Sequence, residues 1–114
     1  MSTDCLFCNI ANGLLSTEFL LETDQMVAFR DLHPVAPTHI LVIPKRHIKS
    51  LADIEAGDGA LLGAIMLAIK ELAREEGLEE GFRVVANTGT DGGQSVHHLH
   101  FHLLGGRSLQ WPPG

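Results

Sequence analysis

Val96-His97-His98-Leu99-His100-Phe101-His102-Leu103-Leu104, residues 96–104, is the most informative stretch of this sequence. Polar and apolar residues alternate along it, and the side chains of a β-strand point alternately to the two faces of a sheet. The spacing therefore predicts a strand over 96–104 with three histidines in a row on one face, about 6.5 Å apart: His98, His100 and His102. The other face is apolar after His97, so a helix can cover it.

A straight row of histidines favours some kinds of chemistry over others. Two neighbours in the row can share one metal ion, but Zn–N bonds of about 2.0–2.1 Å do not let the outer pair converge on the same ion. The row suits an extended polar substrate, with one task for each histidine. The alternatives are a metal-dependent enzyme that uses the row as ligands, and a solvated strand face that happens to carry imidazoles.

The segment just before the row is rich in glycine and polar residues. Gly92-Gly93 lets successive backbone N–H groups turn toward one anion, and Gln94 and Ser95 add side-chain donors. A neutral imidazole next to a bound phosphate can attack phosphorus, and neighbouring histidines can pass a proton to the leaving group. We find no Walker-type phosphate loop and no acidic cluster for Mg²⁺, which favours metal-free transfer.

The remaining patterns predict an α+β fold with a mainly antiparallel sheet. Apolar residues repeat at helical spacing between Asp58, a candidate N-cap, and Gly77, where a helix would stop. A short helical turn is expected over 5–11, before Asn12-Gly13, and a loop over 34–37. Besides 96–104, the expected strands are residues 19–22, 26–30, 39–43 and 82–86.

Composition limits the class of protein. The 114 residues fit a single domain spanning 1–114. A formal charge of −6 argues against a dedicated nucleic-acid or anionic-membrane surface, and the basic stretch Lys45–Lys49 reads as a solvated turn. No apolar run has the roughly 20 residues of a membrane span, and no signal peptide is evident, so we expect a cytoplasmic protein. Cys5 and Cys8, the two cysteines, suggest a metal half-site, a redox pair or two buried thiols.

Residues 98–104 resemble the histidine triad motif, His-φ-His-φ-His-φ-φ, in which φ is apolar. Nearly the whole chain is similar to the Hint branch of histidine triad nucleotide-binding proteins, and the ending Trp111-Pro112-Pro113-Gly114 resembles that branch specifically. His97 departs from the pattern, because the branch commonly has Tyr there. The further matching blocks are residues 28–31, 36–39, 43–45, 91–96 and 104–107.

The resemblance implies a five-stranded antiparallel sheet with one long and one short helix, and two subunits whose sheets join in a homodimer. It makes His100 the nucleophile that takes up a nucleoside monophosphate, and His98 the support for its orientation. His102 and His39 would contact the phosphate and take part in proton transfer. Asp31 would bind the ribose hydroxyls. An apolar pocket for the base would comprise Phe29, Leu32, Leu6, Phe7 and Ile10. The phosphate and leaving group would be surrounded by Asn87, Gly93, Gln94, Ser95 and Val96.

The resemblance also assigns Trp111 and the cysteines. Trp111 would reach toward the partner subunit's site. In some histidine triad proteins a C-x-x-C pair binds zinc together with two histidines, and the matching positions here are His47 and His98, beside Cys5 and Cys8. Such a zinc site would be closed and structural, and would pin the N-terminal segment to the sheet. We expect catalysis itself to require no cofactor. Two histidines stay without a role: His33 and His97.

The function these features favour is hydrolysis of purine nucleoside 5′-phosphoramidates, conjugates of AMP or GMP, at the P–N bond. The products are the nucleoside monophosphate and an amine, formed through a covalent nucleotidyl-histidine intermediate. The alternatives are a dinucleoside polyphosphate hydrolase, which shares the triad but lacks the Trp-Pro-Pro-Gly ending, and a nucleotide-binding regulator whose catalysis is incidental.

Overall fold

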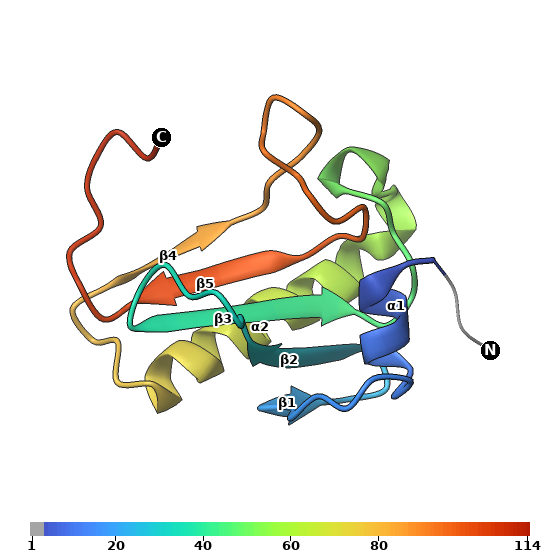
Figure 1. Ribbon diagram of the computed structural model, residues 1–114, viewed down its shortest axis with the longest axis horizontal. Helices are drawn as coiled ribbons and strands as arrows, with labels where there is room; N and C mark the ends of the chain where they lie inside the picture. The colour runs from blue at the N-terminus through green and yellow to red at the C-terminus, as the bar shows by residue number, and fades with distance from the viewer. Residues whose placement is uncertain (1–3) are drawn as a thin grey trace.

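A five-stranded antiparallel sheet forms the centre of the molecule, which a computed structural model describes over residues 4–114 (Figure 1). The strands are β1 (Leu21–Glu22), β2 (Met26–Arg30), β3 (Thr38–Pro44), β4 (Phe82–Val85) and β5 (Phe101–Gly105). Their order in the sheet is β1-β2-β3-β5-β4, and every neighbouring pair is antiparallel. The two α-helices are α1 (Leu6–Ala11) and α2 (Gly59–Glu75). The predicted α+β class, with five antiparallel strands, one short helix and one long helix, is confirmed.

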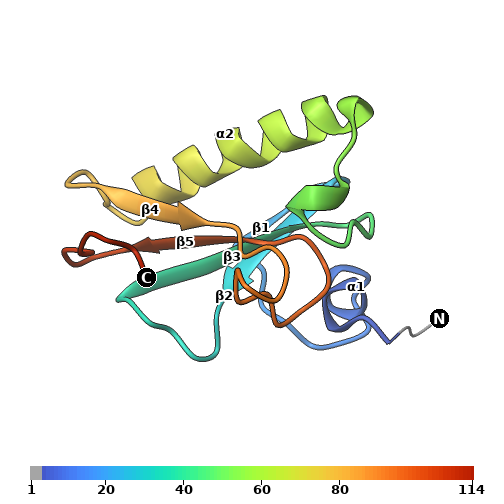
Figure 2. The ribbon, with the colours of Figure 1, turned by 90° about the horizontal axis from the view of Figure 1, so that it is seen from above.

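The sheet separates two apolar cores, because strand side chains alternate between its faces. Figure 2 shows α2 along one face and α1 against the other. The α2-side core holds buried strand residues such as Ile40, Val42 and Leu103. The α1-side core holds the intervening residues, such as Leu41 and Ile43. All seven residues of β3 are therefore buried.

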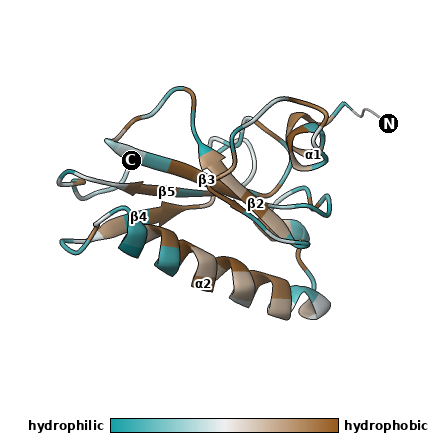
Figure 3. Ribbon diagram, turned by 90° about the horizontal axis from the view of Figure 1, so that it is seen from below, coloured by the Kyte–Doolittle hydropathy of each residue, from teal (hydrophilic) through white to brown (hydrophobic). Residues whose placement is uncertain are grey.

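Helix α2 follows the amphipathic pattern of its sequence. Ile65, Ile69 and Leu72 are buried against the sheet, and Figure 3 shows the hydrophilic turns of α2 gathered at its C-terminal end. Asp58 occupies the N-cap position as expected, but its side chain makes no capping bond to the helix. Its carboxylate accepts from the Glu55 amide and from the Arg46 guanidinium, and so fixes the preceding turn.

Several predicted strand boundaries need correction. The strand over 96–104 was expected to begin at Val96, but β5 begins at Phe101, because the preceding backbone bonds elsewhere: the Leu99 amide donates to the Ile48 carbonyl, 2.6 Å away. β1 covers only the end of the strand expected over 19–22, β3 extends one residue beyond 39–43 at each end, and β4 stops one residue short of 86. Two 3-10 turns were missed: Leu51–Asp53 and Ala56–Asp58.

Within residues 4–114, none of the helices combines the length and the apolar character needed to cross a bilayer.

Candidate functional site

The two central strands bring three histidines together on the α1 side of the sheet. His39 belongs to β3 and His102 to β5, which is its antiparallel neighbour. The His39 Nε2 and His102 Nδ1 atoms lie 2.9 Å apart. His100, one residue before β5, has its ring centroid 5.1 Å from that of His102. Residues more than 60 positions apart in the sequence thus form one cluster.

Hydrogen bonds assign the proton on His100. Its Nδ1 lies 2.6 Å from the backbone carbonyl oxygen of His98. A carbonyl oxygen only accepts, so the proton of the neutral ring is on Nδ1 and donates to that oxygen. The Nε2 atom then carries the lone pair, which is the form of imidazole that attacks an electrophile. This hydrogen bond to the carbonyl fixes the orientation of the His100 ring.

The same reasoning orients the proton between His39 and His102. The Val35 amide donates to His39 Nδ1 over 3.1 Å, so the neutral His39 ring carries its proton on Nε2. That proton is donated to His102 Nδ1, which leaves the proton of His102 on Nε2. The cluster therefore presents a lone pair on His100 and an N–H donor on His102.

Both paired histidines are held neutral. Burial lowers the pKa of His102 to about 4, and the proximity of His100 and His39 adds to the shift. Burial also lowers the pKa of His39, although the nearby Asp31 carboxylate opposes this. The proton assignments of His39 and His102 thus apply at neutral pH.

Asp31 follows β2 and lies beside the pair. One carboxylate oxygen accepts from the His33 amide over 2.8 Å, and the other is 3.5 Å from His39 Nε2. The second distance is too long for a strong hydrogen bond. Because that oxygen makes no short bond to His39, it stays able to accept from a hydroxyl.

The structure divides the expected base pocket in two. Phe7, Phe29 and Ile10 are buried in the α1-side core. The Phe7 ring meets His100 edge-on, with centroids 5.0 Å apart, and so forms one wall beside the histidines. Leu6 and Leu32 are exposed, Leu32 by 90%, and are free to contact another molecule.

The glycine-rich segment forms a loop closed by its own side chains. Asn87 Nδ2 donates to the Gly92 carbonyl over 2.7 Å. Gln94 Oε1 accepts from the Gly89 amide, and its Nε2 donates to the carbonyls of Lys49 and Val96. Gln94 therefore shapes the loop, rather than offering the free donor that the sequence suggested. The remaining expected contacts lie at or after this turn: Gly93 and Ser95 are exposed, and Val96 packs partly against the α1-side core.

The cysteines form a second cluster, next to the first. Cys5 lies at the N-cap of α1 and Cys8 within its first turn. His98 Nδ1 is 3.3 Å from Cys5 Sγ and 3.4 Å from Cys8 Sγ, and His47 Nδ1 is 3.3 Å from Cys8 Sγ. All four ligand atoms lie within 4.8 Å of one another. Burial, followed by the contact with Cys5, raises the pKa of Cys8 to about 11.

The donor set of this second cluster fits Zn²⁺. His98 Nε2 donates to the Pro44 carbonyl over 2.8 Å, which leaves the Nδ1 lone pair facing the thiols. A ligating histidine whose other nitrogen donates to a carbonyl is the usual arrangement in metal sites. Tetrahedral zinc with ordinary bond lengths separates N and S ligands by about 3.6 Å, close to the distances found here.

Asp31, His39 and His102 also lie close enough together to be considered as metal ligands. The proton positions of the two histidines do not suit metal binding. His39 Nδ1 accepts from Val35, so ligation through Nε2 would require an anionic imidazolate. The two clusters therefore have different chemistry: one fits a metal, and the other suits proton transfer.

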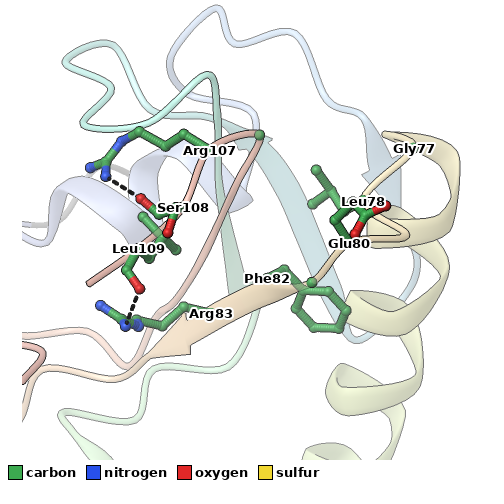
Figure 4. Close-up of a pocket in the computed structure, with 10 residues that line it drawn as sticks. Gly77, Leu78, Glu80, Phe82, Arg83, Arg107, Ser108 and Leu109 are labelled. Atoms are coloured by element: carbon green, nitrogen blue, oxygen red, sulfur yellow. Dashed lines mark hydrogen bonds between the residues drawn. The ribbon is translucent and has the colours of Figure 1, made fainter. Parts of the chain in front are cut away.

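The C-terminal segment lies outside both clusters. Trp111 is 82% exposed, and the Arg83 guanidinium holds the chain before it through the carbonyls of Leu109 and Gln110. A cavity of about 680 Å³ lies between the start of this segment, β4 and the turn after α2 (Figure 4). No histidine lines it. Within the part of the chain described, the histidine cluster is thus separate from this cavity.

Sequence reasoning missed the backbone groups of the site. The Val35 amide and the carbonyls of Pro44 and His98 fix the proton positions of three histidines. Backbone groups carry no side-chain signature, so no sequence pattern identifies them. The only available signal was the Pro-rich segment 34–37, which indicated a fixed loop beside His39.

Comparison with known proteins places this geometry in context. The sequence model of the HIT domain matches residues 13–109. An uncharacterized HIT-like protein of Synechococcus elongatus is 53% identical over 114 residues, which cover all of both chains. A HIT family hydrolase of Legionella pneumophila has a similar structure, with a TM-score of 0.95 and 49% identity over 97% of this chain and 100% of that one. The structure of a histidine triad nucleotide-binding protein of Candida albicans is also similar, with a TM-score of 0.81 and 33% identity over 96% of this chain and 83% of that one.

Proposed function

This chain belongs to the HIT domain family, and from that membership we propose that it is a nucleotide-binding hydrolase that cleaves purine nucleoside 5′-phosphoramidates. The P–N bond breaks to give a nucleoside monophosphate and an amine. The structurally similar proteins support the general class, since one is a HIT family hydrolase and another a histidine triad nucleotide-binding protein. The observation that carries the reaction type is the hydrogen bond from His100 Nδ1 to the His98 carbonyl, because it leaves Nε2 free as a nucleophile.

The reaction then proceeds in two balanced steps. His100 Nε2 attacks phosphorus and forms a P–N bond to the enzyme, while the bond to the substrate amine breaks and the amine takes up a proton. Water next attacks phosphorus, His100 leaves with its electron pair, and the monophosphate is released. Splitting one difficult hydrolysis into two displacements is the advantage of a covalent intermediate.

His102 is the proton donor that the geometry favours. Its Nε2–H is not used by His39, and its ring centroid is 5.1 Å from that of His100. His39 donates its Nε2–H to His102 Nδ1 and so keeps the Nε2–H of His102 directed toward the leaving amine. In the second step His102 Nε2 takes back a proton from the attacking water. Asp31 receives the ribose hydroxyls on its free carboxylate oxygen.

The test is AMP release from adenosine 5′-phosphoramidate by wild type, His100→Ala and the control His97→Ala, whose side chain is exposed. We expect His100→Ala to lose at least about 1,000-fold in kcat, because the covalent path is gone. His97→Ala should keep the wild-type rate. A wild-type rate for His100→Ala would refute the nucleophile assignment. AMP binding without any turnover by wild type would favour a regulator instead.

We also propose that Cys5, Cys8, His47 and His98 hold a structural zinc ion, on the donor set and distances given above. When bound, zinc would tie α1 to the turn after β3 and to the segment before β5. Elemental analysis of protein purified without added metal or chelator tests this. About one zinc per chain is expected, and Cys5→Ser with Cys8→Ser should remove it; less than about 0.1 zinc per chain in wild type would contradict the site.

The homodimer remains a proposal, supported by an unpaired sheet edge. β4 is one of the two outer strands, and its Phe82 and Val84 are exposed on the α2 side. Leu67 on the outer surface of α2 is 68% exposed. Joining two β4 edges would pair their backbone groups and cover this surface. Sedimentation analysis should give a dimer for wild type and a weakened one for Val84→Lys; a wild-type monomer at micromolar concentration would exclude it. The cytoplasmic location likewise stays a prediction.

A further inference from the structure

The loop between β2 and β3 controls which nitrogen of His39 carries the proton. The Val35 amide, on this loop, donates to His39 Nδ1 over 3.1 Å. If that contact were lost, the proton could move to Nδ1, and His39 Nε2 would become an acceptor. His102 would then donate from Nδ1 to His39, and its own Nε2 would lose the proton that faces outward. This backbone amide therefore favours one direction of the proton path, and the Asp31 carboxylate oxygen, 3.5 Å from His39 Nε2, favours the same direction.

Two features of the turn after β5 hold this loop in place. The Arg107 guanidinium donates to the Val35 carbonyl over 2.9 Å, and to the Ser108 carbonyl over 3.0 Å. Arg107 thus bridges the loop and its own turn; Figure 4 shows the second of these bonds. Gly106 lies against the same loop so closely that a Cβ there would be 2.8 Å from Pro37 Cβ. The turn and the loop are therefore packed in contact, and not merely joined by one long side chain.

We propose that Arg107 is a positioning residue: acting through Val35, it fixes the Nε2–H tautomer of His39 and so keeps the outward proton on His102 Nε2. The effect on catalysis rests on the proposed function, whereas the tautomer of His39 exists without any substrate. Arg107 is exposed and its bonds go to backbone carbonyls, so it acts on the site only through the loop. A charge-assisted hydrogen bond to a carbonyl is strong enough to matter for a loop that is otherwise mostly exposed.

The direct test is NMR of protein labelled with ¹⁵N in its histidine rings. Long-range ¹⁵N–¹H correlations distinguish an imidazole protonated on Nε2 from one protonated on Nδ1. Wild type should show His39 with Nδ1 unprotonated. Arg107→Ala should shift the His39 signals toward the Nδ1–H form, and Arg107→Lys, which keeps one donor, should restore them in part. The control is Arg74→Ala, which removes an exposed arginine paired with Glu71 on α2; it should leave the His39 signals unchanged.

A second pair of variants separates the amide from the side chain of Val35. Val35→Pro removes the N–H, whereas Val35→Ala keeps it and trims a side chain that is 61% exposed. The Nδ1–H form of His39 should appear only with proline. Circular dichroism and the melting temperature establish that each variant is folded. If either Arg107→Ala or Val35→Pro is folded and His39 keeps the wild-type tautomer in it, the proposal is refuted.

Kinetics supply the link to the reaction. With adenosine 5′-phosphoramidate, Arg107→Ala should lower kcat about tenfold, less than the 100-fold or more of losing a general acid outright. KM should change by less than about twofold, because Arg107 contacts no substrate. A change confined to KM would contradict the positioning role. If wild type lacks this activity, the proposed function fails, while the tautomer measurement still decides the present inference.

Discussion

Replacing Gly92 by alanine should damage the glycine-rich loop, because the backbone of Thr88 occupies the space that a side chain would need. A Cβ on Gly92 would overlap the Thr88 carbonyl oxygen and lie 2.8 Å from the Thr88 amide nitrogen. Both are backbone atoms, so no rotation of a side chain relieves the overlap. Since ordinary contacts are about 3.5 Å or longer, one side of the loop must move by about 1 Å.

The cost follows from that displacement. Overpacking of this kind costs about 1–3 kcal/mol of folding stability. For a domain of this length, 2 kcal/mol corresponds to a fall in Tm of about 8 °C. The bond from Asn87 to the Gly92 carbonyl is strained by the same movement. A misplacement of 1 Å at groups that contact a reacting phosphate can lower the rate about 100-fold, so kcat/KM should fall more steeply than stability does.

The assay compares Gly92→Ala with Gly57→Ala, where a Cβ would meet nothing within 4 Å. Urea unfolding followed by circular dichroism gives the stability, and AMP release gives kcat/KM. We expect Gly57→Ala to match wild type in both. If Gly92→Ala also matches wild type in both, the close approach does not constrain the loop and the reasoning is wrong.

Three other predictions follow from features already described. Removing zinc with a chelator should lower Tm by about 10 °C, because zinc at 100 times its Kd stabilises the folded protein by about 2.7 kcal/mol. The Tm of a Cys8→Ser variant should not respond to the chelator. The free energy of unfolding should fall by about 1–2 kcal/mol as the pH falls from 6.5 to 4. Burial lowers the pKa of His102 in the folded protein to about 4, so the unfolded chain takes up this proton at a higher pH than the folded one. Urea titrations should show a weaker pH dependence in His102→Asn. Leu103→Ala should cost about 3 kcal/mol in the same assay, because Leu103 is fully buried, whereas Leu14→Ala, at an exposed position, should cost less than about 0.5.

The sequence predicts those parts of the fold where burial imposes a period. β2 has the predicted bounds, and α2 begins and ends where its polar neighbours and Gly77 indicated. The predicted start of β5 is wrong because polar and apolar residues already alternate from Val96 onward. The backbone before Phe101 does not pair with a strand, since the Leu99 amide donates to the Ile48 carbonyl. Alternation records where side chains point, and it does not identify the partner of each amide.

The same limit applies to the site. Two histidines of the row, His100 and His102, lie together as expected, but His98 turns its ring to the cysteines. The three histidines therefore do not form a straight row: the ring of His98 belongs to the cysteine cluster, and the rings of His100 and His102 belong to the histidine cluster. His98 serves both, since its ring faces the thiols and its carbonyl holds His100. A single residue with two unrelated tasks is beyond what spacing alone can predict.

The two cores on opposite faces of the sheet determine where the chain tolerates changes in length. Inserting one residue in β3 before Leu41 would turn every later side chain of the strand to the opposite face of the sheet. Leu41 and Ile43 would then move from the α1 side to the α2 side. An insertion at the exposed positions 12–16, between α1 and β1, changes no such assignment. Natural length variation in proteins of this architecture should therefore concentrate in connections such as 12–16, and be rare within β3 and β5.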